Sequence, residues 1–261
     1  MLIDTHCHLA AAEFAADRES MLARARAAGV AALVVPAVER ANFAAVSDLA
    51  HNRNDVFAAY GIHPLAVERA CEDDLEWLRR TLTTERRAVA VGEIGLDRFV
   101  EGRDEVRQGF YFVEQLKIAR DLGLPVILHV RRAIDPVLRE LRRIKVSGGI
   151  AHAFNGSRQQ ADEFIKLGFV LGFGGAMTYP SARRIRQLAA ALPLNSIVLE
   201  TDAPDMAPEW IRGGRNEPKE LMRIAETLAE LRKLPVAECI KATGENTRRV
   251  LPRLIIPPHA G

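Results

Sequence analysis

The sequence is poor in cysteine. Its 261 residues include only three, an odd number whose spacing matches no zinc-ribbon pattern: Cys7, Cys71 and Cys239. A disulfide framework is therefore not expected, and a reducing compartment, the cytoplasm, fits best. The N-terminus has no basic segment followed by an apolar one, so we expect no signal peptide. No apolar run approaches the ~20 residues that span a bilayer, so no membrane contact is expected.

The excess of positive over negative charge is also small. Lys plus Arg is 36 and Asp plus Glu is 34, which gives a formal net charge of +2. A nucleic-acid-binding domain usually has a stronger basic excess, so any positive potential must be local to a site. Aromatic residues make up only 6%. A short groove that binds a strand end is therefore more consistent with the composition than a long channel of stacked bases.

What the chain does have is a regular alternation of short β-branched runs with longer amphipathic segments. The strand-like runs cover residues 2–4, 32–35, 56–61, 88–92, 126–129, 149–152, 169–173 and 197–200. The helix-like segments cover residues 13–28, 41–51, 73–82, 104–122, 134–144, 158–167, 181–190 and a stretch that starts near 217. A last helix is expected at residues 236–250.

This alternation indicates the fold class. Near-continuous apolar runs are typical of strands buried on both faces of a parallel sheet, and strict strand–helix alternation is typical of α/β proteins. Eight repeats in a chain of this length favour a single (β/α)8 barrel over an open sheet. We expect the barrel to cover residues 1–251 and an irregular, proline-rich tail to cover residues 252–261.

Polar residues follow the strand-like runs, at the end of a (β/α)8 barrel where function resides. Residues two apart on a strand point the same way, so His6 and His8 can both face the barrel mouth. Taken singly, each such histidine could be a satisfied core residue, and an acid could simply pair with an arginine. Together they predict a metal site made of four histidines and two acids: His6, His8, Glu93, His129, His152 and Asp202.

The ligand types and their number indicate what is bound. Nitrogen and oxygen ligands in this mixture suit zinc, manganese or other borderline divalent ions, and magnesium remains open. Six ligands are too many for one tetrahedral zinc, whereas two divalent metal ions bridged by a carboxylate would use them all. Glu93 is the expected bridge, because it lies between the two groups of histidines in barrel order.

These residues resemble the TatD-type deoxyribonuclease family, within the amidohydrolase superfamily of barrels. The matching motifs are, in order, Asp4-Thr5-His6-Cys7-His8, Gly61-Ile62-His63-Pro64, Gly92-Glu93-Ile94-Gly95-Leu96-Asp97, Leu128-His129-Val130-Arg131, His152-Ala153-Phe154, Glu200-Thr201-Asp202-Ala203-Pro204 and Arg215-Asn216-Glu217-Pro218. They run along nearly the whole chain.

The resemblance implies a divalent-metal hydrolase that acts on phosphodiesters, with the family's ligand roles at the six positions above. It also marks His63 as a substrate-side residue that hydrogen-bonds a phosphate oxygen, although a turn histidine before Pro64 is an equally open interpretation. Ala153 stands where many relatives have cysteine, and Arg98 where many have an aromatic residue. Arg98 is expected at the mouth, where it bears on which substrate is accepted.

The sequence therefore predicts a metal-dependent phosphodiester hydrolase of the 3′–5′ exonuclease type, acting on single-stranded nucleic acid or a nucleotide. No obligate protein partner is expected. Asp202 and Glu93 are the expected catalytic carboxylates, with Asp202 as the general base. Arg131 and Arg215 are expected to contact phosphates, because the planar guanidinium suits them, and surface salt bridges are the alternative.

Three other functions stay open at this point. A small-nucleotide phosphodiesterase fits the near-neutral charge. An amide or lactone hydrolase could use the same barrel, but the superfamily often bridges its metals with a carboxylated lysine, and Glu93 occupies that place here. A non-catalytic metal-binding protein is the third, and a complete ligand set with a candidate base argues against it.

Overall fold

Eight parallel strands, each hydrogen-bonded to the next along the chain, form the centre of the molecule. The computed structural model describes residues 1–256. The strands are β1 (Leu2–Asp4), β2 (Val30–Pro36), β3 (Val56–Tyr60), β4 (Ala88–Asp97), β5 (Val126–Arg131), β6 (Gly149–Ala151), β7 (Phe169–Phe173) and β8 (Ile197–Leu199). Each strand lies next to its neighbour in the sequence, from β1 to β8 with none skipped, as a (β/α)8 barrel requires.

The first and last strands come together just beyond their ends. The backbone N–H of Thr5 donates to the carbonyl oxygen of Leu199 over 3.1 Å, and the N–H of Asp202 donates to the oxygen of His6 over 2.8 Å. These bonds bring β1 and β8 together, so the sheet forms a nearly closed barrel. The predicted fold class is confirmed.

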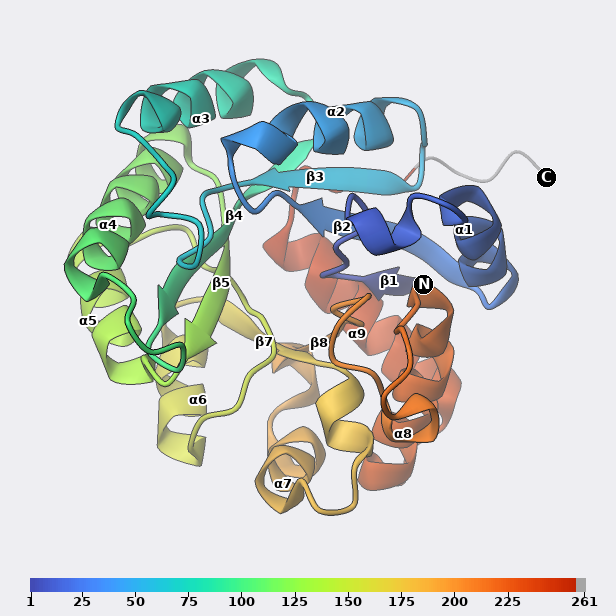
Figure 1. Ribbon diagram of the computed structural model, residues 1–261. Helices are drawn as coiled ribbons and strands as arrows, with labels where there is room; N and C mark the ends of the chain where they lie inside the picture. Colours follow the sequence, from blue (N-terminus) through green and yellow to red (C-terminus); the bar gives the residue numbers. More distant parts are fainter. Residues whose placement is uncertain (257–261) are drawn as a thin grey trace.

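Helices surround the barrel on its outside (Figure 1). They are α1 (Arg18–Ala27), α2 (Phe43–His51), α3 (Asp73–Thr84), α4 (Glu105–Leu122), α5 (Ile134–Ile144), α6 (Arg158–Lys166), α7 (Arg183–Ala191), α8 (Leu221–Arg232) and α9 (Val236–Val250). Local chemistry sets several of their ends. The Asp104 carboxylate accepts the N–H of Arg107 at the start of α4, and Gly123 in the left-handed region ends that helix.

Some element boundaries differ from those that the sequence predicts. Strand β4 does not end at Gly92 but continues to Asp97, because its register shifts between Val91 and Ile94 and pairing with β5 resumes afterwards. Helix α1 begins at Arg18 rather than near Glu13, after a short 3-10 turn. Glu93 is consequently a buried residue within a strand and not the residue that terminates it.

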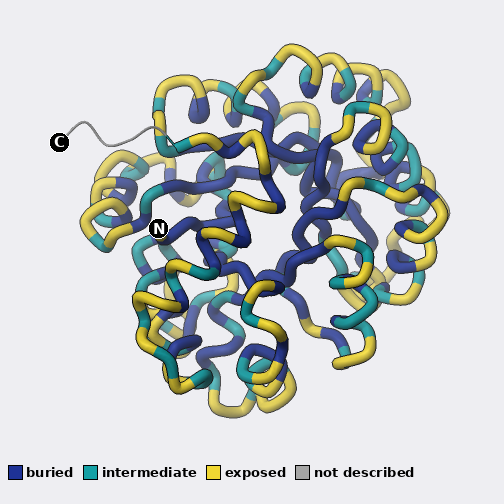
Figure 2. Tube along the Cα trace, turned by 180° about the vertical axis from the view of Figure 1, so that it is seen from behind, coloured by how far each residue is buried: buried dark blue, intermediate teal, exposed yellow. Residues whose placement is uncertain are grey.

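The core lies in two layers. The outer layer packs the strands against the helices, and the strands in the middle are buried while the outer helix faces are exposed (Figure 2). The inner layer fills the barrel itself with one or more apolar residues from every strand: Ile3, Ala32, Val34, Phe57, Ala59, Val89, Ala90, Ile127, Ile150, Val170 and Val198. The interior is therefore a packed core and not a pore.

The segment after the last helix packs against this interior. Leu251 and Leu254 belong to the same cluster as the inner-face strand residues, and Leu254 is only 3% exposed. Residues 251–256 have no helix or strand. The division of the chain at residues 251 and 252 stays a prediction, and residues 257–261 of the expected tail lie outside the described residues.

Membrane insertion can be assessed for the same part of the chain. No helix within residues 1–256 is both long and apolar enough to cross a bilayer.

Candidate metal centre

The strand period brings the predicted ligands to the barrel mouth. Ile127 and Ile150 face the interior core, so the residues two positions further, His129 and His152, lie above it on the same side. The Cα partners in the sheet place Leu128 opposite Ala151, and the two histidines are thus neighbours across β5 and β6. The apolar interior of the barrel therefore packs directly beneath both imidazoles.

In a first group, the Nε2 atoms of His6 and His8 lie close to each other, to one oxygen of Glu93 and to one oxygen of Asp202. The Nε2 atoms of His6 and His8 lie 3.3 Å apart. The His6 Nε2 is 3.1 Å from Glu93 Oε2 and 3.6 Å from Asp202 Oδ1. The His8 Nε2 is 3.7 Å and 3.4 Å from the same two oxygens.

These distances fit a metal ion. Atoms bound tetrahedrally to an ion at about 2.1 Å lie about 3.4 Å from one another, and the measured separations of 3.1–3.7 Å agree with that value. Both Nε2 atoms approach each other and the carboxylates closely. The donor set of two imidazoles and two carboxylates therefore matches a divalent ion.

A second group lies on the other side of the Glu93 carboxylate. Its Oε1 atom is 2.9 Å from His129 Nδ1, 3.6 Å from His63 Nε2 and 3.9 Å from His152 Nε2. His63 Nε2 and His129 Nδ1 are 3.1 Å apart. Glu93 thus presents one oxygen to each group, which is the geometry of a bridging carboxylate.

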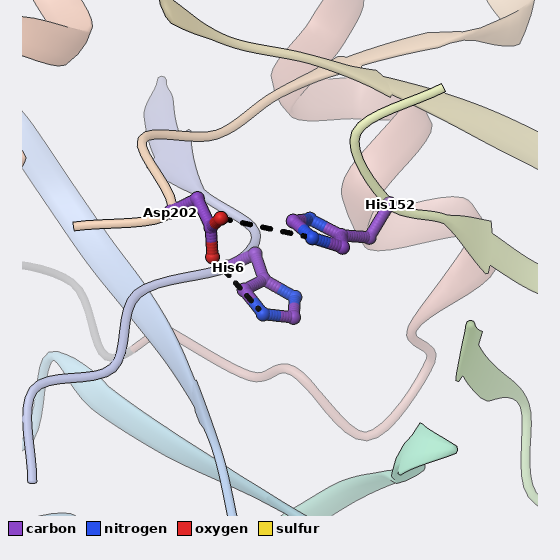
Figure 3. A group of neighbouring side chains, drawn as sticks. All are labelled: His6, His152 and Asp202. Carbon is purple, nitrogen blue, oxygen red and sulfur yellow. Dashed lines mark ion pairs between the residues drawn. The ribbon is translucent and has the colours of Figure 1, made fainter. Parts of the chain in front are cut away.

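Asp202, in the segment after β8, lies between the two groups. Its Oδ1 atom is in the first group, while its Oδ2 atom is 3.9 Å from His152 Nε2. Figure 3 shows His6, His152 and Asp202 converging on one another, and the rings of the two histidines stack with centroids 3.8 Å apart. All six predicted ligands are therefore brought together, and His63, predicted on the substrate side, lies with them.

Two buried carboxylates outside the predicted set orient the histidines. Asp97 Oδ2 is 3.0 Å from Nε2 of His129, on the opposite side of the ring from Glu93. Glu200 Oε1 is 3.1 Å from Nδ1 of His152. A carboxylate hydrogen-bonded to a ligating histidine fixes its ring orientation and tautomer, as Asp97 does for His129. Glu200 lies within ion-pair distance of His152 and attracts its imidazole by charge.

Neither supporting carboxylate was identified from the sequence, although a signal was present. Asp97 lies four residues after Glu93, and Glu200 lies between Val198 and Asp202, so the strand period places both on the ligand side. Gly172 gives Glu200 its room, since a Cβ on that glycine would overlap the Glu200 carboxylate. Buried acids at strand ends need a partner, and here each has a histidine.

The segment that carries Asp202 is fixed by a third buried acid. The Asp4 carboxylate accepts the Thr201 N–H over 2.9 Å and the Thr201 hydroxyl over 2.6 Å, and the His6 N–H over 3.3 Å. Asp202 itself has a φ of 57°, in the left-handed region that non-glycine residues seldom adopt. The strained backbone persists because the hydrogen bonds of Asp4 hold both neighbouring segments.

Electrostatics keep the two ligand carboxylates ionised. Burial alone would raise the pKa of Glu93, but His6 and His63 outweigh it, and that pKa lies well below its usual range. Burial would likewise raise the pKa of Asp202, but His152 and His8 lower it overall. Carboxylates must be deprotonated to bind a cation, so both are suited to that role.

The histidines respond in two directions. Burial lowers the pKa of His6 and of His63. Burial would also lower the pKa of His152, but the charges of Glu200 and Asp202 outweigh it and raise the pKa to about 10. The ionised carboxylates therefore give the site a negative charge that favours bound positive charge, and a divalent cation would supply that positive charge.

All the ligands except the fully buried His6 line an open cavity of about 1340 Å³. This volume exceeds the ~300–1,000 Å³ of common small-ligand pockets. Arg131 lies on its wall, as the sequence predicts for a substrate residue, together with Arg132. The cavity can therefore hold more than the reacting group of a substrate.

Arg215 lies apart from this cavity lining. Its guanidinium donates to both oxygens of Asp17 over 2.8 and 2.7 Å, to Glu217 over 2.9 Å and to the carbonyl oxygen of Glu13. The Arg215 guanidinium holds the pKa of Asp17 at about 2. The structure thus engages Arg215 in ion pairs, which was the alternative to a phosphate contact.

A nearly closed (β/α)8 barrel with histidine and carboxylate groups gathered at its mouth is the architecture of a metal-binding enzyme barrel. Comparison with known proteins agrees. A family model described as TatD related DNase matches residues 3–252, nearly the whole chain. The chain belongs to this TatD-related family and is a metal-dependent hydrolase.

Individual relatives support the same assignment. The chain is 45% identical over 249 residues to a protein of Escherichia coli named uncharacterized metal-dependent hydrolase YjjV, covering 94% of this chain and 95% of the relative. It is 33% identical over 267 residues to human deoxyribonuclease TATDN3, covering 97% and 95%. The crystal structure of Escherichia coli YjjV, described as a TatD homologue, matches with a TM-score of 0.93 and 43% identity over 96% of this chain and 98% of that one.

Proposed function

We propose that this protein uses two divalent metal ions to hydrolyse phosphodiester bonds at the 3′ end of single-stranded DNA. The observation that carries the proposal is the pair of ligand groups that share the two oxygens of Glu93. The human relative is named a deoxyribonuclease, which favours DNA as the substrate class. The direction of cleavage and the preference for single strands rest on the resemblance of the motifs.

Each ligand group would hold one ion. His6, His8, Glu93 Oε2 and Asp202 Oδ1 would bind the first. Glu93 Oε1 and His129, with His152 nearby, would bind the second. Bound zinc, manganese or magnesium would supply Lewis acidity, which lowers the pKa of water and offsets charge on a phosphoryl group.

The roles of the two ligand carboxylates differ because their exposure differs. The Asp202 side chain is 13% exposed and the Glu93 side chain only 2%. Asp202 can therefore contact the attacking water and accept its proton, and its lowered pKa keeps it ionised for that purpose. Glu93 is enclosed by histidines and orients the two groups relative to each other.

His63 and the arginines would act on the phosphate. His63 lies on the cavity wall beside the second group, where an imidazole N–H can donate to a non-bridging oxygen. Arg131 lies on the same cavity and can contact a phosphate with its planar guanidinium. Arg215 stays a proposed substrate contact only if a substrate displaces Asp17 and Glu217 from it.

The test is hydrolysis by the purified protein after chelation, with Mg²⁺, Mn²⁺ or Zn²⁺ added back separately. The substrates are a labelled single-stranded oligonucleotide and a small chromogenic phosphodiester. We expect metal-restored release of single nucleotides from the 3′ end, and loss of this activity in His129→Ala. Absence of oligonucleotide cleavage with metal demonstrably bound would contradict the proposal.

A small-nucleotide phosphodiesterase is the second candidate. The net charge of +2 favours it, because a polymer-binding protein usually has a larger basic excess. Hydrolysis of the small diester without the oligonucleotide would support it. Inactivity on both would instead direct attention to amide and lactone substrates, which the same barrel can accommodate.

A further inference from the structure

Two arginines on the cavity wall have no acidic partner. Arg131 ends β5 and Arg132 follows it, and both side chains are exposed and line the cavity. Within residues 1–256 neither guanidinium takes part in an ion pair or a hydrogen bond, whereas Arg184 on the same cavity donates to Asn155 over 2.7 Å. Arg131 and Arg132 are thus free to bind an anion.

An aromatic ring holds these two guanidinium groups. The central carbon of the Arg131 guanidinium lies 3.7 Å from the centroid of Phe99, and that of Arg132 lies 4.6 Å from it. Phe99 follows β4 and is 42% exposed. Stacking on an aromatic face orients a guanidinium without using its N–H donors, so all of these donors remain available to a ligand.

The opposite side of the cavity carries the opposite charge. Glu13, in the segment after β1, and Asp205, after β8, are exposed and line the same cavity. Strands β8 and β1 lie across the barrel from β4 and β5, as the strand order requires. Figure 1 shows β4 and β5 on the left and β1 with α1 on the right. The metal-type ligands lie between the two walls.

Neighbouring charges do not cancel this asymmetry. Asp135 is the acid nearest the two arginines in sequence and also lines the cavity, but it makes no ion pair with either of them and supplies one negative charge against two positive ones. Arg215 lies near Glu13, but Asp17 and Glu217 neutralise it. The arginine wall therefore keeps a net positive charge and the wall of Glu13 and Asp205 a net negative one.

We propose that Arg131 and Arg132 bind the backbone phosphate next to the scissile one. On the other side of the cavity, the carboxylates of Glu13 and Asp205 repel phosphate. This side therefore accepts only a strand end without a phosphate, namely the 3′ hydroxyl end. The polymer then leaves the centre over the loops after β4 and β5, and the terminal nucleoside lies toward the loops after β8 and β1. This inference rests on the proposed phosphodiesterase function and explains why cleavage would start at a strand end.

The asymmetry supplies both binding and direction. A charge-assisted contact from a planar guanidinium to phosphate is stronger than a neutral hydrogen bond. Like charges facing one another across an interface disfavour the wrong arrangement. An internal segment of a strand would place phosphates on both walls, so the attraction to the arginines would be offset by repulsion from Glu13 and Asp205. A strand end avoids this repulsion and is bound in preference.

The first experiment replaces both arginines, as Arg131→Gln/Arg132→Gln, and compares an oligonucleotide with a small diester that has no neighbouring phosphate. We expect the ratio of kcat/KM for the oligonucleotide to that for the small diester to fall at least about tenfold, mainly through KM. The dependence of log KM on log salt concentration should flatten by about 0.7 per arginine. Arg139→Gln/Arg142→Gln removes the same two charges from α5, where the side chains are 74% and 50% exposed and lie outside the cavity lining, and it is the matched control.

The same experiment separates failure of the inference from failure of the proposed function. If the wild type cleaves the oligonucleotide and the double variant keeps both the ratio and the salt dependence, the arginine wall does not bind the neighbouring phosphate. If the wild type cleaves neither substrate with metal bound, the proposed function itself is wrong. An equal loss on both substrates would show general damage to the site and would overturn the inference.

Phe99 is proposed as a residue that positions the two arginines, and two substitutions of its ring test this role. Phe99→Tyr keeps the stacking face and should keep the substrate ratio of the wild type, whereas Phe99→Leu should raise KM for the oligonucleotide more than it lowers kcat. A fall in kcat alone, or the same effect from both variants, would contradict a role through the arginines.

The acidic wall is tested with oligonucleotides that carry either a hydroxyl or a phosphate at the 3′ end. The wild type should prefer the hydroxyl end by about fivefold, since the two exposed carboxylates repel the extra charge. Glu13→Gln/Asp205→Asn should bring this preference close to one. Equal cleavage of both ends by the wild type, or an unchanged preference in the variant, would overturn this part of the inference.

Discussion

The two ends of the barrel use the same strand faces for different purposes. Toward the closed end, Ile127 and Ile150 fill the interior with apolar side chains. Two residues further along the same strands, His129 and His152 face the mouth and join the candidate metal centre. A step of two residues, about 7 Å along a strand, thus separates packing from chemistry.

The difference lies in what each end requires of a side chain. At the closed end an inner-face residue needs only the right volume, because it has no polar atoms to satisfy. At the mouth a buried polar side chain needs a partner of suitable charge, as the pairs of Asp97 with His129 and of Glu200 with His152 show. Substitutions at the two ends should therefore affect different properties.

The largest expected effect is on activity and follows from Asp202→Asn at the mouth. Loss of the general base should lower kcat by about 10²–10⁴-fold, while the thermal midpoint stays close to that of the wild type, because Asn keeps the shape of Asp. Hydrolysis assays and thermal unfolding of the same preparations measure both. Asp162→Asn on the exposed face of α6 is the control, and full activity of Asp202→Asn would disprove the base role.

At the closed end we expect the converse from Leu254→Ala. Removing a side chain packed into the interior cluster should lower the free energy of unfolding by about 2–5 kcal/mol, with little change in activity per folded molecule. The neighbouring Ile255 is 74% exposed, so Ile255→Ala should change stability by less than about 0.5 kcal/mol. Urea unfolding measures the stability of both variants. Equal stabilities would show that the packing of Leu254 against the barrel interior does not stabilise the fold.

Glu200→Gln tests the carboxylate that supports His152. Gln keeps the side-chain shape but cannot hold the imidazole by charge, so metal affinity should fall about 10–100-fold. Isothermal titration of the chelated protein with Mn²⁺ or Zn²⁺ measures this, with Glu163→Gln on α6 as the control. Unchanged affinity would mean that His152 needs no support from Glu200.

The smallest expected effect is the pH dependence of Asp97. Burial would raise its pKa, but hydrogen bonds from His129 and from the N–H groups of Phe99 and Val100 outweigh burial and lower the pKa to about 2. A lowered folded pKa contributes stability above the ordinary value near 3.8, and this stability is lost as the pH falls through 2. The stability difference between wild type and Asp97→Asn, with chelator present, should therefore be constant above pH 5 and shrink between about pH 4 and pH 2. A difference that does not change over that range would contradict the assignment.

Sequence reasoning predicted the strands because each is a short apolar run with a clear boundary, as at Phe169–Phe173. The predicted β4 was too short, because an acidic residue such as Glu93 is typical of a strand end. The register shift that allows the strand to continue has no sequence signature. The predicted α1 also began too early, since the 3-10 turn at Ala12–Phe14 has the same local composition as a helix.

By itself the sequence determined that the metal-type ligands gather at the mouth. Residues two apart on a strand face the same side, so a ligand two positions after Ile127 or Ile150 lies above the barrel interior. Only the tertiary structure decided which group partners which. Glu200 meets His152 across 48 positions of sequence and Asp97 meets His129 across 32, while Arg215 is bound by Asp17 and Arg131 is left free. Such pairings depend on distances of a few ångströms between segments far apart in the sequence, and local sequence patterns do not specify distances at that range.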